Sequence, residues 1–134
     1  MKKNIAIIGF LLISVCAYGQ QSTDVHSTPE KLVSSMFSAI KTKDNCVLRD
    51  LCDYYPKEAD ADVMAVCGLF YLPQEAYEMF VAEFGKAYIS GYVTYETYEG
   101  VSYANVPIKF GKNVDKDETI QCVNRAGKWF LYQY

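Results

Sequence analysis

The chain has 134 residues, of which 51% are hydrophobic and 22% charged, so its composition is that of one folded domain and not of a disordered or multidomain chain. It carries 13 Lys and Arg against 16 Asp and Glu, a formal net charge of −3. This mild acidity, with no Lys/Arg cluster, argues against the basic stripe with which nucleic-acid-binding proteins neutralise phosphates. We therefore expect no nucleic-acid partner.

The first residues predict an export signal. Lysines precede an apolar stretch over residues 5–16, and the small residues at 17–19 follow at the spacing of a cleavage site. We expect a signal peptide over residues 1–19 and an exported protein, periplasmic or extracellular. No membrane span is expected, because the apolar run is shorter than the roughly 20 residues of a spanning helix. Lipidation at Cys16 is the alternative, although Val15 stands where a lipoprotein box has Gly, Ala or Ser.

Beyond the leader, residues 20–27 are polar and without periodicity, and we expect them to form a flexible arm. The arm carries His26, the only histidine. Since no partner stands at a catalytic or metal-binding spacing, we interpret His26 as a plain surface residue. A single domain is expected over residues 28–134.

A helix is predicted at the start of this domain. Thr28 offers an N-cap oxygen, Pro29 stands at the first helical position, and Glu30 suits the positive end of the helix dipole. Apolar residues follow at three-and-four spacing over 32–40, which indicates one buried stripe.

Three further helices are predicted before the strands. One begins after Asp44 or Asn45, either of which is a suitable N-cap, and a short one covers about 60–68. The strongest helical repeat in the chain begins at Pro73 and is expected to end at Gly91.

From there the period of the pattern changes from about 3.6 to about 2 residues, which predicts strands. Short links of turn residues separate them, so we expect an antiparallel meander. Pro107 predicts a bulge or an unpaired N–H position in the second strand. The predicted strands cover residues 92–99, 102–110, 118–124 and 129–134.

Helices first and a strand meander afterwards predict an α+β fold. We expect the N-terminal helices to pack on one face of a curved four-stranded antiparallel sheet. In the second strand Ala104 and Val106 take one face while Tyr103 and Asn105 take the other, so one face is expected to meet the helices.

The order of elements and four short strings resemble the nuclear-transport-factor-2-like (SnoaL-like, cystatin-like) superfamily, in particular its small secreted bacterial members that look like lumazine-binding domains. The resemblance covers residues 27–134 and implies a cone-like barrel with a pocket between the concave sheet and the helices. Members include isomerases, dehydratases, cyclases and non-catalytic binding domains, so the resemblance implies a fold more than a function. The strand that often lies between the early helices is not evident here. The strings are Ser27-Thr28-Pro29-Glu30, Ala39-Ile40-Lys41-Thr42-Lys43-Asp44, Gly127-Lys128-Trp129-Phe130, and Tyr98-Glu99-Gly100 to Ala104-Asn105-Val106.

Four cysteines remain beyond the leader, an even number in an oxidising compartment, which predicts two disulfides. If the second and third helices formed an antiparallel hairpin about Tyr55-Pro56, positions equidistant from that turn would lie opposite each other, which pairs Cys46 with Cys67. Cys52 with Cys122 then follows by elimination. The alternative is four small buried apolar residues.

Aromatic residues are the candidates for ligand contact, because Tyr and Trp combine rigid contact area with a polar tip. Some of those on the strands must lie on the face away from the helices, and an exposed aromatic patch often marks a recognition surface. Core packing is the alternative for each residue. The candidate ligand-binding residues are Tyr77, Tyr95, Tyr103, Trp129 and Tyr132.

The sequence offers no pattern that specifies a cofactor, a metal site or a catalytic residue. Asn113, Asp115 and Asp117 resemble the start of a calcium loop, but Glu118 and Asn124 stand where that loop has Gly and Glu, so a turn is expected.

We therefore expect a non-catalytic domain that binds a small ligand or a protein partner, and a homodimer is left open. The alternative is an isomerase- or dehydratase-like enzyme, in which an inward acid meets an inward Tyr in an apolar pocket. Glu96 is the acid considered, and its alternation with Tyr95 and Thr97 allows either face. Asp50 and Asp53 have the spacing of a solvated helix face.

Overall fold

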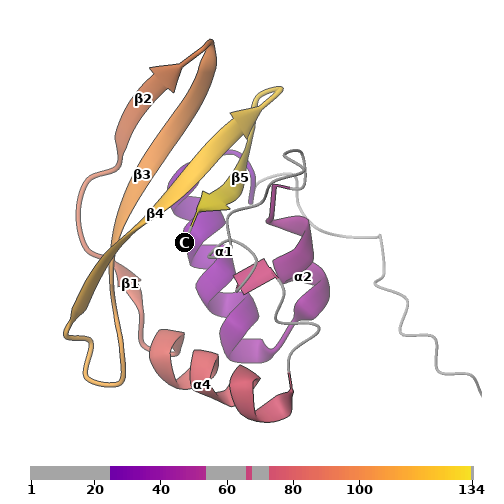
Figure 1. Cartoon of the computed structure of the whole chain (residues 1–134), viewed down its shortest axis with the longest axis vertical. Coiled ribbons are helices and arrows are strands. Elements are labelled where there is room, and N and C mark those ends of the chain that lie inside the picture. The colour runs from indigo at the N-terminus through magenta and orange to yellow at the C-terminus, as the bar shows by residue number, and fades with distance from the viewer. Residues whose placement is uncertain (1–24, 54–65, 68–72, 134) are drawn as a thin grey trace, which may run out of the picture.

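The computed structural model describes residues 25–53, 66–67 and 73–133 (Figure 1). The predicted leader and most of the predicted third helix lie outside these residues. The elements in chain order are α1 (Pro29–Thr42), α2 (Asn45–Asp50), α4 (Gln74–Phe84), β1 (Tyr88–Ile89), β2 (Thr94–Tyr98), β3 (Val101–Phe110), β4 (Lys116–Arg125) and β5 (Lys128–Gln133).

The first two helices begin at side-chain caps. Thr28 Oγ1 accepts a hydrogen bond from the N–H of Lys31 at 3.2 Å, and Asp44 Oδ1 accepts one from the N–H of Val47 at 3.1 Å. Each cap satisfies a backbone donor that has no partner within its helix. α1 ends at Lys43, whose φ of 56° stops the right-handed helix.

The helix that opens after Pro73 is shorter than the sequence predicts. α4 ends at Phe84 with Gly85 as its C-cap, and Tyr88 and Ile89 already form β1, so the expected end at Gly91 is wrong. Gly91 has another role, because a Cβ there would lie 3.3 Å from Cγ of Pro107.

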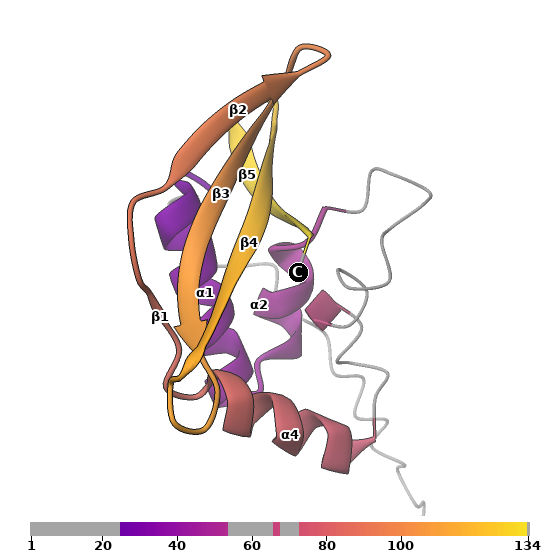
Figure 2. The ribbon, with the colours of Figure 1, turned by 60° about the vertical axis from the view of Figure 1, so that its left-hand side comes forward.

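The sheet confirms the predicted α+β class and the predicted curved antiparallel sheet, which curls into a half-barrel (Figure 2). β3 is the central strand: β4 pairs with it along one side, and β1 and β2 pair with different parts of its other side. β5 pairs with the far side of β4. The short β1 adds to the four predicted strands. Pro107 pairs in register with Thr119, and no bulge occurs there.

Two short backbone segments cover the outer edge of β5. The N–H of Trp129 donates to the carbonyl of His26 at 2.9 Å, and the N–H of Leu131 donates to the carbonyl of Leu51 at 2.8 Å. Cys52 forms a parallel bridge with Leu131. These bonds satisfy backbone groups that an open sheet edge would leave exposed.

Within the described residues, no helix is long and apolar enough to cross a membrane.

One hydrophobic core joins α1 to the sheet. Phe84 of α4 stacks on Phe110 of β3 with ring centroids 5.2 Å apart, which attaches α4 to the sheet. The fully buried core residues include Leu32, Val33, Met36 and Ile40 of α1, Ala104, Val106 and Ile108 of β3, and Ile120 and Cys122 of β4.

The disulfide pairing differs from the expected one. Cys52 bonds to Cys67, while Cys122 is a free, buried thiol, so the expected Cys46–Cys67 and Cys52–Cys122 bonds are both wrong. Cys46 is also disulfide-bonded. Leu131 pairs with Cys122 on one side and with Cys52 on the other. Two strand spacings of about 4.8 Å each therefore separate Cys52 from Cys122, beyond the Cα separation of roughly 4.4–6.8 Å that a disulfide requires.

The hairpin argument for Cys46 fails for a related reason. It assumed that the second helix runs directly into a turn at Tyr55-Pro56. α2 ends at Asp50 instead, with Leu51 as its helical C-cap, and the backbone of Leu51 and Asp53 then bonds to Leu131 of β5. Cys52 is then the cysteine that meets Cys67, with Cα atoms 6.2 Å apart.

Candidate functional site

The structure separates the five candidate aromatic residues into three places. Tyr77 lies on α4. Tyr103 and Tyr132 lie together on the outer face of the sheet, and Tyr95 and Trp129 lie together on the inner face, which also carries the core. A single aromatic site made of all five is therefore not formed.

Tyr77 is a buried residue of the helical layer. It is 5% exposed, and the Lys43 ammonium lies 6.0 Å from the centre of its ring. Burial raises the pKa of its hydroxyl, and the negative charge of Asp44 adds to this shift. Among the described residues the hydroxyl has no hydrogen-bond partner. These contacts are those of packing, and they assign Tyr77 to the core.

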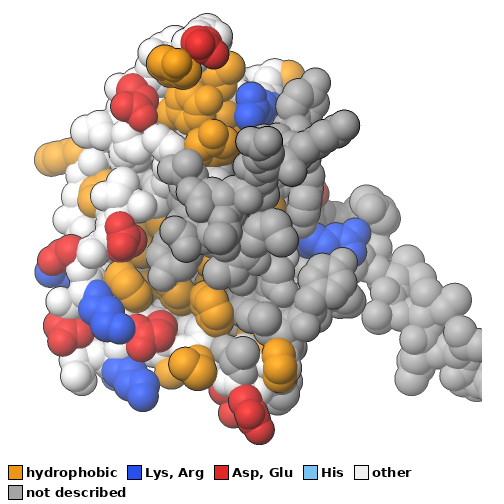
Figure 3. Space-filling view, viewed as in Figure 1, with side chains coloured by type: hydrophobic (Ala, Val, Ile, Leu, Met, Phe, Trp, Pro, Cys, Tyr) orange, Lys and Arg blue, Asp and Glu red, His pale blue; other side chains and the backbone are white. Residues whose placement is uncertain are grey.

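The outer-face pair packs beside an ion pair. The rings of Tyr103 and Tyr132 lie 5.3 Å apart, and both side chains are half-buried. Arg125, two positions after Val123 on the same face, donates to Asp53 at 3.0 Å. Asp53 is 8% exposed, so the interpretation of Asp53 as part of a solvated face is wrong. Hydrophobic side chains gather at this end of the sheet, where the β2–β3 and β4–β5 turns lie (Figure 3).

The inner-face pair connects β2 with β5 across the curled sheet. Tyr95 is in register with Ala104, Cys122 and Leu131, a row that is buried except at Tyr95, which is 60% exposed. Trp129 lies on β5, and two strands separate β5 from β2. Their rings nevertheless lie 5.9 Å apart, inclined at 58°. This contact requires the sheet to curl, because three flat spacings would separate the two strands by about 14 Å.

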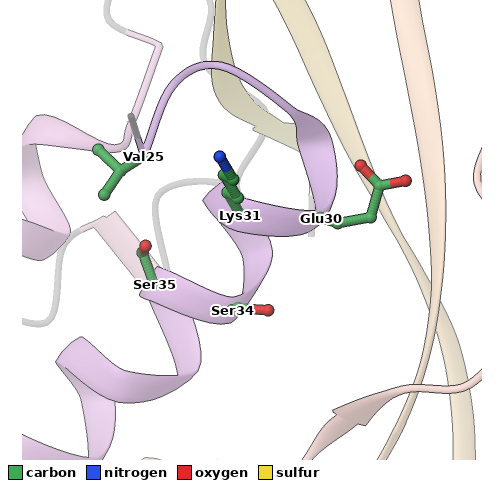
Figure 4. A pocket seen from close by; sticks show the side chains of 5 residues that line it. All are labelled: Val25, Glu30, Lys31, Ser34 and Ser35. Atoms are coloured by element: carbon green, nitrogen blue, oxygen red, sulfur yellow. The ribbon is translucent and has the colours of Figure 1, made fainter. Parts of the chain in front are cut away.

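Glu30 adds an acid to this aromatic pair. It stands in the first turn of α1, and its carboxylate points away from the helix toward the strands (Figure 4). Partial burial raises the pKa of the Tyr95 hydroxyl, and the negative charge of Glu30 raises it further. The negative charge of Glu30 also adds, after burial, to the raised pKa of Cys122, which lies on the same face of the sheet as Tyr95. We name Tyr95, Trp129 and Glu30 the aromatic–acid site.

A surface depression of about 330 Å³ borders this site at Glu30. Its volume lies at the lower end of the range of about 300–1,000 Å³ that is typical of small-ligand pockets. In the close-up, Ser34 points to the same side of α1 as Glu30, as positions four apart on a helix do, while Lys31 points elsewhere (Figure 4). The depression is lined by Val25, Glu30, Lys31, Ser34 and Ser35.

Glu96, the acid that the sequence singled out, lies on the outer face. It is in register with Tyr103, and its carboxylate accepts a hydrogen bond from Nε2 of Gln121 at 3.0 Å. Glu96 therefore does not meet Tyr95, its neighbour in the strand, because alternate positions face opposite sides. Glu30, on α1, is the acid whose charge acts on the Tyr95 hydroxyl instead.

His26 is buried, and its interpretation as a surface residue is wrong. It is 8% exposed, and its ring lies 4.7 Å from that of Phe130. Nδ1 lies 2.7 Å from the carbonyl oxygen of Trp129, and Nε2 lies 3.2 Å from Oδ2 of Asp50. This arrangement joins the chain before α1, the end of α2 and β5. It indicates a structural junction, and within the described residues no group of acids, Cys or His is placed to hold a metal ion.

Comparison with protein-family models, with curated proteins and with solved structures finds no match. The assignment of the site therefore rests on geometry. Sequence reasoning missed Glu30 as a site residue, because its place in the first turn of a helix is sufficiently explained by the helix dipole. The i, i+4 pair of Glu30 and Ser34, both polar and beside a buried stripe, is the signal in the sequence that indicates a polar edge there.

Proposed function

We propose that this chain is a non-catalytic binding domain and that the aromatic–acid site contacts its ligand. The observation that carries the proposal is the exposure of Tyr95, whose row is fully covered at every other position. An aromatic ring that is fixed against Trp129 and open to solvent offers rigid contact area at little entropic cost. Glu30 supplies a polar group that orients a ligand, and the adjacent depression offers room for a small one.

The single tryptophan of the chain gives a direct test. Trp129 is part of the site, so its fluorescence reports ligand contact without a label. We expect a panel of planar heterocycles, sugars, amines and carboxylic acids to contain a compound that changes this fluorescence saturably. Tyr95→Ala should abolish the change. Tyr98→Ala is the matched control, because Tyr98 lies on the same strand, is 66% exposed and faces the other side. A panel with no Tyr95-dependent response would contradict the proposal.

A second candidate function is acid/base catalysis, favoured by the effect of the Glu30 charge on the Tyr95 hydroxyl. A carboxylate base beside a neutral phenol is the combination that moves a proton next to a carbonyl group. The raised pKa of Tyr95 keeps its hydroxyl protonated and able to donate. Conversion of cyclohex-3-enone to its conjugated isomer, followed by absorbance, tests this candidate. Catalysis requires that the protein accelerates this isomerisation and that Glu30→Gln loses the acceleration. An isomerisation rate equal to that in buffer alone would contradict this candidate function.

We propose that the fold is the cone-like barrel of the nuclear-transport-factor-2-like superfamily, with the helices on its concave face. The shared core of α1, β3 and β4 supports this, as does the contact between Tyr95 and Trp129 across the curl. An experimental structure in which α1 left the inner face of the sheet would contradict it.

We also propose export, with cleavage after Gly19. The Cys52–Cys67 disulfide supports an oxidising compartment. N-terminal sequencing of protein from the cell envelope should begin at Gln20. An intact Met1 would contradict export by this route, and a lipid on Cys16 would favour the anchored alternative.

A further inference from the structure

We infer that the aromatic–acid site binds the ammonium group of a small organic cation. The inference rests on the proposed binding function and adds the chemical class of its ligand. Three features of the site carry it: two aromatic rings in contact, a carboxylate directed toward the strands, and an inner face beneath the rings that carries no charge.

The two rings offer aromatic surface that suits a cation. A cation is attracted to the negative face of an aromatic ring when it lies within about 6 Å of the ring centre, and tryptophan is the strongest partner. The centroids of Tyr95 and Trp129 are 5.9 Å apart with their planes inclined at 58°. The side chain of Tyr95 is 60% exposed and its ring contacts Trp129, so an ammonium group that approaches Tyr95 also comes close to the indole.

Glu30 supplies the opposite charge. Its carboxylate is directed toward the strands (Figure 4), and its negative charge adds to the effect of burial in raising the pKa of the Tyr95 hydroxyl. The inner face beneath adds no competing charge: Ala104 is apolar, and burial raises the pKa of Cys122 to about 12, so its thiol is neutral. A ligand cation is thus the charge that the site lacks, whereas a carboxylate or phosphate would be repelled by Glu30.

Two lysines stand next to site residues in the sequence, and each points in another direction than its neighbour in the site. Lys31 follows Glu30 on α1 and also lines the depression, but its side chain points in a different direction from that of Glu30 (Figure 4). Lys128 precedes Trp129 on β5, and neighbouring strand positions face opposite sides of the sheet.

Choline and 3,3-dimethylbutan-1-ol form the probe pair for this inference, because they have nearly the same shape and differ in charge. We expect choline to change Trp129 fluorescence saturably and at least ten-fold more tightly than the neutral alcohol. In Glu30→Gln this preference should fall to about two-fold, while Glu30→Asp should retain part of it. Circular dichroism of each variant confirms that the fold is kept, which is expected because Glu30 is exposed.

The possible results separate the ligand class from the binding function. If both probes bind equally and both depend on Tyr95, the ammonium inference is wrong and the proposed function stands. A preference for choline that survives in Glu30→Gln also overturns the inference. If choline gives no Tyr95-dependent change, the ammonium inference is wrong. The proposed binding function is then decided by the wider panel of compounds described above.

Discussion

His26 shows how one side chain holds together segments that are distant in the sequence. The oxygen of Trp129 that faces Nδ1 is a carbonyl and carries no proton, so Nδ1 is the donor of that bond. Nε2 faces the carboxylate of Asp50 and donates to it when the ring is protonated. The ring also covers Phe130. The residue therefore contributes packing and hydrogen bonding at the same point.

Replacement of His26 by Ala should lower the free energy of unfolding by about 2–3 kcal/mol, because it removes a buried ring and leaves the Trp129 carbonyl without that donor. Urea unfolding followed by Trp129 fluorescence measures this change. Asp50→Asn is the control and should cost less than about 1 kcal/mol, since the Asp50 side chain is 54% exposed. Equal losses in the two variants would show that the ion pair, and not the junction, is the main contribution.

Cys122 should be unreactive in the folded protein. It is fully buried, and burial raises the pKa of its thiol from 9.0 to about 12, with a further contribution from the charge of Glu30. At pH 8 we expect no modification of Cys122 by Ellman's reagent without denaturant and full modification of Cys122 in urea, as read from the labelled peptide. Rapid labelling of Cys122 in the native protein would show that the inner face is open to solvent at this point.

The raised pKa of Cys122 also predicts how the free energy of unfolding changes with pH. The folded state holds the thiol proton more tightly than the unfolded state does, so this contribution is fully present below about pH 9 and is lost as the pH rises toward about 12. In Cys122→Ala the part of the alkaline loss that comes from this thiol should be absent. Unfolding curves at pH 8 and pH 11 for both proteins measure the difference.

At the scale of elements, the two hairpins use the same turn geometry with different residues. Two residues separate β2 from β3 and two separate β4 from β5, and the φ angles of both residues are positive in each turn. Such turns match the twist of the strands and favour Asn-Gly or Asp-Gly. Here Glu99 precedes Gly100 and Ala126 precedes Gly127, so the first position of each turn carries a residue that is disfavoured at positive φ.

Ala126→Asn should therefore raise the free energy of unfolding by roughly 0.5–1 kcal/mol, because Asn adopts the left-handed conformation more readily. Gly127→Ala is the opposite control. No atom lies within 4 Å of the added Cβ, so the expected loss of about 1 kcal/mol comes from the backbone alone at φ 84°. Thermal melting of the two variants measures the expected gain of stability in Ala126→Asn and the expected loss in Gly127→Ala. A destabilising Ala126→Asn would contradict this account of the turn.

Local patterns predicted most elements but not their long-range contacts. Thr28 and Asp44 act as the expected caps, and the alternation of Ala104 and Val106 correctly assigned the buried face of β3. Gly91 misled the prediction of the helix end, since a glycine after an apolar helical repeat is typical of a C-cap, whereas this one packs against a proline on β3.

The candidate site was predicted only in part, for reasons of geometry. Tyr95 and Trp129 were both identified, but nothing local indicates that they touch, because their contact depends on how strongly the sheet curls. Glu96 was chosen for its place in an alternating strand, and its face became known only from the register with Tyr103. Glu30 comes from a helix more than sixty positions away from Tyr95, a distance that sequence periodicity does not bridge.

For the whole molecule, the Cys52–Cys67 disulfide fixes the segment that covers the edge of β5. Cys52 bridges Leu131, and the neighbouring backbone groups of Leu51 and Asp53 bond to Leu131. The disulfide closes a loop with a sequence separation of 15, for which loss of chain entropy in the unfolded state gives a stabilisation of about 3 kcal/mol. Asp53 in turn holds Arg125 of β4, so the bond supports the covered edge as a unit.

The double variant Cys52→Ala/Cys67→Ala should lower the free energy of unfolding by about 2–4 kcal/mol, and amide exchange should rise first at Leu131 and Asp53, whose N–H groups make the edge bonds. Amides in the pairing of β3 with β4 should stay protected, because those strands pair along most of their length without help from the disulfide. Cys122→Ala is the control for loss of a buried sulfur without loss of a cross-link. If the control lost as much stability as the double variant, cavity formation would explain the effect. Uniform exchange over the whole sheet would show that the edge of β5 does not open as a separate unit.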